Sequence, residues 1–73
     1  MLPTTSGLDT IKRLKKAGFV IVRQRGDHVR LEKNLSDKTI KLTVPLHDQL
    51  KKGTLRRIIK DAELSIRAFN ELG

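Results

Sequence analysis

The chain has 73 residues, a mass of 8.3 kDa and no cysteine. This length predicts a single domain over residues 1–73, and the lack of cysteine excludes a disulfide framework and a cysteine-based zinc site. No apolar run approaches the ~18 residues of a membrane span, and the N-terminus lacks the apolar segment of a signal peptide. The sequence therefore predicts a soluble cytoplasmic protein with no membrane partner.

Positive charge is the strongest compositional feature. Sixteen lysines and arginines against eight aspartates and glutamates give a net charge of +8 and a pI near 10.5. Such an excess favours polyanions, nucleic acid above all, although a membrane surface or an acidic protein are alternatives. Phe19 and Phe69 are the only aromatic residues, so the usual platforms for base stacking are missing. We expect a surface that contacts the nucleic-acid backbone.

A helix is predicted over about residues 7–17, after a loose lead-in at residues 1–5. Ser6 is a suitable N-cap, and Gly18 is a natural end for the helix. Apolar residues between them share one arc of the helix at helical spacing, and these are Leu8, Ile11 and Leu14.

Three strands are predicted next. The β-branched run Phe19–Val22 is typical of a central strand. Residues 28–32 and 39–44 alternate between apolar and polar residues, and Pro45 ends the last strand. The intervening turns at residues 24–27 and 34–37 are short, which predicts an antiparallel meander.

A second helix is predicted from Gly53–Thr54 onward, and Ser65 is expected to cap a short C-terminal helix. The predicted fold class is α+β, a two-layer α-β-β-β-α sandwich with a three-stranded antiparallel sheet and a short C-terminal helix. One face of the sheet is left open to solvent. This order resembles the double-stranded-RNA-binding-domain fold, whose members contact phosphates and 2′-hydroxyls mostly by shape.

His28 is the candidate proton-transfer residue. It begins a strand whose alternation turns it to the open face, and imidazole can exchange protons at neutral pH. Arg23, Arg25 and Arg30 lie close in sequence and are expected to hold a phosphate and neutralise its charge in the transition state. The alternative is that His28 is an ordinary exposed strand residue.

His47, in the loop after Pro45, has two interpretations: a second acid/base or phosphate contact, or a loop residue that shapes the entry to the next helix. Two histidines with scattered carboxylates match no metal-site spacing, so neither metal nor cofactor is expected. Basic residues on the helices either form a solvated face or follow the RNA backbone. The residues expected to follow it are Lys12, Arg13, Lys16, Lys51, Lys52, Arg56 and Arg57.

Four segments of the chain resemble the HicA toxins, also called the YcfA-like family. They are AGF at 17–19, RQRGDH at 23–28, VPLH at 44–47 and GTLRRIIKDAELS at 53–65. The resemblance covers about residues 6–72 and implies ribosome-independent mRNA cleavage, a cognate HicB antitoxin, and His28 as the family's catalytic histidine. Asp27 stands where the family usually has serine or another small residue, and Glu63 stands where it usually has glycine.

The leading interpretation is the toxin of a type II toxin–antitoxin pair, a metal-independent endoribonuclease with His28 as general acid/base. RNA and a HicB-like antitoxin are the expected partners, and the toxin alone is expected to be monomeric. One alternative is a non-catalytic RNA-binding module of the same fold. Another is an interaction protein whose basic face binds an acidic partner.

Overall fold

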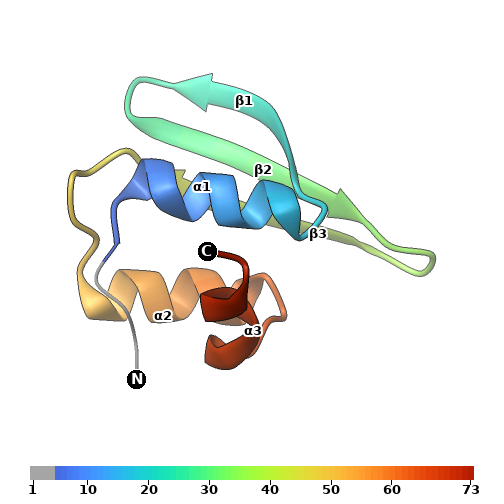
Figure 1. The fold of residues 1–73 in the computed structure, drawn as a ribbon. Coiled ribbons are helices and arrows are strands. Elements are labelled where there is room, and N and C mark those ends of the chain that lie inside the picture. Colours follow the sequence, from blue (N-terminus) through green and yellow to red (C-terminus); the bar gives the residue numbers. More distant parts are fainter. Residues whose placement is uncertain (1–4) are drawn as a thin grey trace.

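Figure 1 shows the fold in the computed structural model, which describes residues 5–73. The elements are α1 (Gly7–Lys16), β1 (Val20–Arg25), β2 (His28–Asn34), β3 (Thr39–Pro45), α2 (Lys52–Asp61) and α3 (Ile66–Glu71). The strands form one antiparallel sheet. The order confirms the predicted α+β class, with its three-stranded sheet and short C-terminal helix.

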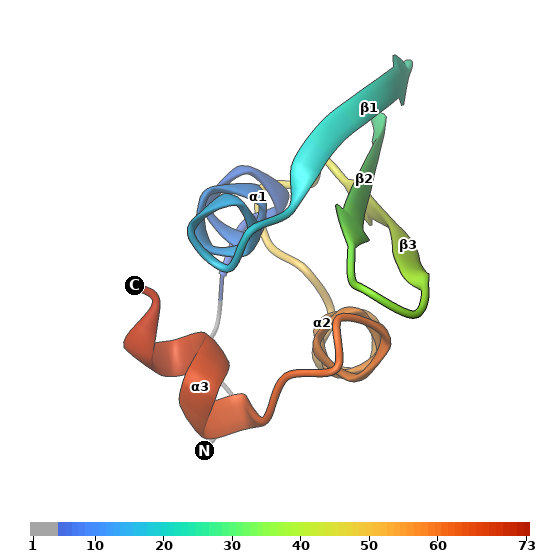
Figure 2. The same cartoon turned by 90° about the vertical axis from the view of Figure 1, so that its right-hand side faces the viewer.

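The strand order is β1-β2-β3, so β2 is the central strand. The prediction of a central strand at Phe19–Val22 is therefore wrong, because β1 lies at an edge. α1 and α2 pack against β3, while β1 extends away from both helices (Figure 2). Val20, Ile21 and Val22 consequently stay 58%, 47% and 48% exposed. A β-branched run fits any pleated strand, and so it does not separate an edge strand from a central one.

The core fills the space between the two helices and the covered face of the sheet. The predicted alternation of β2 and β3 is confirmed, since every second residue of β3 is buried. The buried apolar residues are Ile11, Leu14, Phe19, Val29, Leu31, Ile40, Leu42, Val44, Leu50, Leu55, Ile58, Ile59, Ala62 and Phe69. Leu8 is not among them: it is 57% exposed although it shares the apolar arc of α1.

The segment before α1 is tied to the loop between β3 and α2. Leu50 N donates a hydrogen bond of 2.9 Å to the carbonyl of Thr5, and Thr5 is buried. The expected loose lead-in is thus wrong for Thr5, while residues 1–4 lie outside the described part. At the start of α1, Gly7 packs so closely that a Cβ there would overlap the carbonyl oxygen of Pro45.

The segment that follows α2 contains a strained residue. Glu63 has a φ of 59°, in the left-handed region where side chains other than glycine are disfavoured. Its carboxylate lies 2.6 Å from Lys38 Nζ, in the turn between β2 and β3. The ion pair therefore joins the far end of the sheet to the segment between α2 and α3.

Candidate functional site

The turn between β1 and β2 places two histidines on one carboxylate. Gly26 has a φ of 59° and begins a two-residue turn with Asp27, as in hairpins that have glycine at the first turn position. Asp27 Oδ1 lies 3.2 Å from His28 Nδ1, and Asp27 Oδ2 lies 3.5 Å from His47 Nε2. The side chains of Asp27, His28 and His47 are 58%, 63% and 59% exposed, so a large substrate has access to all three.

Backbone contacts fix this cluster. Leu46 N donates a hydrogen bond of 2.6 Å to the carbonyl of Asp27, which joins the β1–β2 turn to the loop after β3. Gly7 N donates a bond of 2.9 Å to the carbonyl of His47. Because Gly7 also packs against Pro45, the first turn of α1 supports the segment that carries the second imidazole.

The register of β1 and β2 gathers the three predicted arginines around His28. Arg25 lies directly opposite His28, and Arg23 lies directly opposite Arg30. Opposite residues share a face of an antiparallel pair. Since Val29, between the two β2 residues, is buried, His28 and Arg30 face away from the core, and the β1 arginines face the same way. The four side chains that sequence reasoning singled out therefore share the open face of the sheet.

A bulge in β1 produces this arrangement. Ile21 lies opposite Leu31, whereas Arg23 already lies opposite Arg30, so Val22 is an extra residue in the strand. Strict alternation from Ile21 onward would have turned both β1 arginines toward the helices. The extra residue shifts the alternation by one position and brings them to the open face.

The predicted basic residues of the helices do not share this face. α1 and α2 cover the opposite side of the sheet (Figure 2). Lys51 and Lys52 stand where the loop carrying His47 enters α2, at the same end of the molecule as the β1–β2 turn, whereas Lys16 ends α1 at the other end (Figure 1). The exposed members of the predicted set are Lys12, Lys16, Lys51, Lys52, Arg56 and Arg57.

Arg13 differs from the other predicted basic residues because it is bound within the fold. Its Nε lies 3.0 Å from Asp9 Oδ2, and its guanidinium donates to the carbonyls of Phe69 and Asn70 at 3.2 and 3.3 Å. Its side chain is only 18% exposed. Hydrogen bonds from Thr5 and from Arg13 lower the pKa of the Asp9 carboxyl. Arg13 therefore connects α1 to α3.

Sequence reasoning missed the role of Asp27 as the link between the two histidines. The only available signal was its position next to His28, since contact with His47 depends on the meeting of two distant loops. The sequence prediction also omitted Lys41, an exposed cation opposite Glu32 on the open face. Over residues 5–73, no three histidine, aspartate or glutamate side chains gather closely enough to hold a metal ion.

The family described as "HicA toxin of bacterial toxin-antitoxin" matches residues 7–64, which is most of the chain. This chain belongs to the HicA toxin family. No curated protein matches it closely enough to count as a relative. Membership makes this HicA chain the toxin of a toxin–antitoxin pair and implies an antitoxin partner. In the described part of the HicA chain, no helix is long and apolar enough to cross a bilayer.

Proposed function

We propose that this toxin is a metal-independent endoribonuclease that cleaves mRNA, with His28 as its general acid/base. The observation that carries the proposal is the open face on which an exposed imidazole stands beside three guanidinium groups. A group that moves a proton and cations that neutralise a phosphate are what phosphodiester transfer needs. Since mRNA is the substrate, we also propose that the toxin acts in the cytoplasm.

Asp27 determines which nitrogen of His28 faces the RNA. Its carboxylate lies against Nδ1, which leaves Nε2 free on the open side. In the proposed step, Nε2 takes the proton of a ribose 2′-hydroxyl while the 2′-oxygen forms a bond to the adjacent phosphorus. The bond from phosphorus to the 5′-oxygen breaks. The products are a 2′,3′-cyclic phosphate and, once the leaving oxygen gains a proton, a 5′-hydroxyl.

His47 is the proposed source of that second proton. It is the only other imidazole in the chain, and its Nε2 lies 3.5 Å from the carboxylate that also contacts His28. One carboxylate thus positions both groups, so that one accepts a proton while the other donates one. Water can replace a donor to a leaving oxygen, and we therefore expect His47 to matter less than His28.

The three arginines of the open face are proposed to hold the scissile phosphate. Arg25 stands opposite His28, so it is the nearest to the reacting group, and the Arg23–Arg30 pair lies two positions further along the strands. Guanidinium groups match phosphate oxygens with paired donors. Of the three, Arg30 has a second contact, since its Nε lies 4.0 Å from Glu32 Oε2.

The RNA backbone is proposed to pass from this face around the end of the molecule. Lys51 and Lys52 lie at that end, with Arg56 and Arg57 one turn further along α2. Lys12 and Lys16 extend the basic surface along α1, and Arg13 is left out because it is bound to α3. Counterion release from these contacts would make binding strongly dependent on salt.

A HicB-like antitoxin is the proposed protein partner. The histidine cluster is open to solvent, so control of its activity needs a cover from outside the chain. The same region offers an edge strand with three exposed β-branched residues and a group of arginines, and edge strands of this kind readily pair with another chain. An acidic partner that adds to β1 would reach both features at once.

A non-catalytic RNA-binding module remains the second candidate, because the carboxylate of Asp27 stands where phosphate must approach. Purified toxin incubated with RNA in EDTA separates the two, since only an enzyme shortens the RNA. We expect His28→Ala to lower cleavage by about 10²- to 10⁴-fold with an unchanged circular dichroism spectrum. The matched variant His47→Ala should lose less. Full activity of folded His28→Ala would remove the proposed role.

A further inference from the structure

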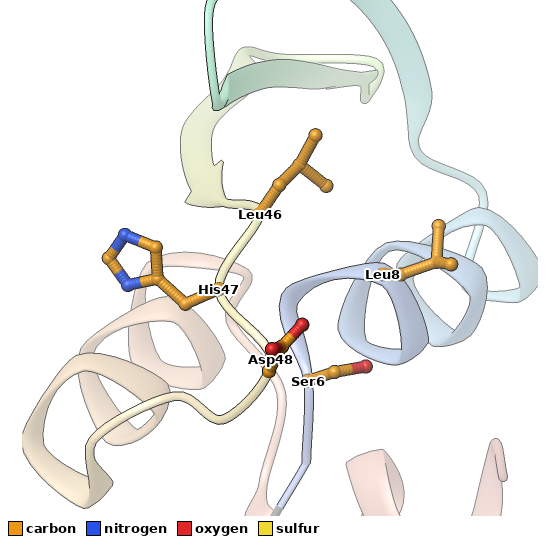
Figure 3. Close-up of a pocket in the computed structure, with 5 residues that line it drawn as sticks. All are labelled: Ser6, Leu8, Leu46, His47 and Asp48. Atoms are coloured by element: carbon orange, nitrogen blue, oxygen red, sulfur yellow. The ribbon is translucent and has the colours of Figure 1, made fainter.

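A surface hollow lies beside the histidine cluster. It has a volume of about 360 Å³ and is lined by Ser6, Leu8, Leu46, His47 and Asp48. This volume is at the lower end of the range for small-ligand sites, about 300–1,000 Å³. Figure 3 shows Leu8 and Leu46 on one side and the Asp48 carboxylate near Ser6 on the other, while the His47 imidazole points away from Leu8. The hollow therefore has an apolar side and a polar side.

Leu8 is the unusual residue of the hollow. It is 57% exposed on the first turn of α1, although covering a leucine side chain lowers the free energy. Leu46 next to it is only half-buried and packs against the core. Two leucines that line the same hollow offer apolar contact for the face of an aromatic ring.

The hollow is close to the proposed reaction centre. Leu46 N donates to the carbonyl of Asp27 at 2.6 Å, and Pro45 lies directly opposite His28 in the sheet. A ring held against Leu8 and Leu46 would therefore lie beside the turn that carries Asp27 and His28.

We propose that this hollow binds one unpaired base of the RNA next to the cut phosphate, with a preference for guanine. The inference rests on the proposed function, because it places the base relative to the cleavage step. Sequence-specific proteins recognise single-stranded RNA by such splayed-out bases, through their faces and their Watson–Crick edges.

Asp48 gives the preference. Its ionised carboxylate only accepts hydrogen bonds. Guanine presents two adjacent donors, the N1–H and the N2 amino group, which match the two oxygens of one carboxylate. Adenine and cytosine present an amino group next to an acceptor nitrogen, and uracil presents one N–H between two acceptors, so each leaves an oxygen facing another acceptor.

Two further features of the hollow fit a guanine. Within residues 5–73, Asp48 forms no ion pair despite the excess of cations. The Ser6 hydroxyl accepts from Asp9 N at 3.0 Å, which leaves its own hydrogen to donate. Guanine O6, next to N1–H, is the acceptor that such a donor would meet.

A binding experiment tests the hollow without any cleavage. The toxin is titrated with each of the four nucleoside 3′-monophosphates, and the methyl signals of Leu8 and Leu46 are followed by NMR. We expect these methyls to shift and GMP to bind at least about fivefold more tightly than UMP, as for a bidentate contact to a base edge. Asp48→Asn should remove the preference, and Leu8→Ala should weaken all four nucleotides alike.

The control is Asp37→Asn, which removes the same charge from the turn between β2 and β3. It should keep the preference for GMP. If the leucine methyls do not shift, or if all four nucleotides bind alike to wild type and Asp48→Asn, the inference is overturned. Binding of an antitoxin segment at these methyls, without any nucleotide binding, would also overturn it.

Cleavage provides the second readout. On an RNA that contains all dinucleotide steps, wild-type toxin should cut preferentially beside guanine, and Asp48→Asn should lose that preference while still cutting. A toxin that cuts no RNA but prefers GMP at the leucine methyls would refute the proposed nuclease and support the hollow. A toxin that cuts RNA without preference, and whose leucine methyl signals do not shift with any nucleotide, would support the proposed nuclease and refute base binding in the hollow.

Discussion

Arg23 and Arg30 lie directly opposite each other on the open face of the sheet. Like charges at opposite positions of an antiparallel pair destabilise it, by up to about 1 kcal/mol. We therefore predict that Arg23→Thr raises the free energy of unfolding, because threonine suits a strand and ends the repulsion. The same change should weaken RNA binding and reduce the slope of log affinity against log salt by about one.

Urea denaturation and binding at several salt concentrations check this pair of effects. Lys41→Thr is the matched control, since it removes a cation of the same face that stands opposite an acidic residue, Glu32. That variant should gain no stability. If Arg23→Thr destabilised the fold and left the salt slope unchanged, the arginine pair would be structural.

Asp27 is expected to act as a positioning residue. Asp27→Asn keeps the size of the side chain but removes the charge that faces both imidazoles. Misplaced catalytic groups lose rate steeply, so we predict a kcat lower by roughly tenfold to a hundredfold. KM should fall as well, since one negative charge leaves a phosphate-binding face. A merely structural role would lower stability without this joint fall in kcat and KM.

Asp27→Ser places the residue type that the family usually has at this position. Like Asp27→Asn, we expect this variant to bind RNA more tightly than the wild-type toxin does. If both variants cut RNA as fast as wild type, His28 would need no carboxylate to orient it.

The left-handed conformation of Glu63 gives a prediction on stability. Glu63→Ala loses the ion pair with Lys38 but keeps the strain, whereas Glu63→Gly loses both. The glycine variant should therefore be more stable than the alanine variant by about 1 kcal/mol. In a domain of this size the difference corresponds to a melting temperature higher by about 4–8 °C. Equal melting temperatures would mean that position 63 carries no strain.

The elements that sequence patterns predicted correctly are those with a strong period. β3 alternates over Thr39–Val44 and β2 over His28–Glu32, and so their buried faces and the exposure of His28 follow directly. In β1 three apolar residues precede Arg23, which breaks the alternation. That break was the only sequence signal of the bulge at Val22, and it does not tell which residue is the extra one.

The parts that local patterns could not predict depend on contacts between distant segments. The approach of His47 to Asp27 requires the loop after β3 to reach the β1–β2 turn, which the register of His28 opposite Pro45 determines. The exposure of Leu8 has the same origin, because helical spacing gives the arc of a residue but not how far the sheet extends beneath it.

Asp9 should make the free energy of unfolding depend on pH in the acidic range. Hydrogen bonds from Thr5 and Arg13 lower its pKa below the ordinary 3.8 in the folded protein. A carboxyl whose pKa is lowered in the folded protein stabilises the fold at any pH above its ordinary pKa. This contribution disappears as the pH falls through the pKa of the folded protein. Asp9→Asn should therefore cost less than about 1 kcal/mol at neutral pH, since the carboxylate is half-exposed. A difference from wild type that persisted at pH 2 would contradict this origin.

The last prediction concerns the antitoxin, which we expect to cover β1 together with His28. β1 is an edge strand with exposed Val20 and Val22 side chains, and its arginines attract carboxylates. The toxin in complex with its antitoxin should show slower hydrogen exchange at residues 20–28 than the free toxin. Charge pairs across an interface speed association, so Arg25→Glu should slow binding most at low salt. Arg67→Glu on α3, which is 91% exposed, is the matched control and should bind like wild type. Protection confined to α2 and α3, with β1 exchanging as in the free toxin, would instead place the antitoxin on the helices and require inhibition at a distance.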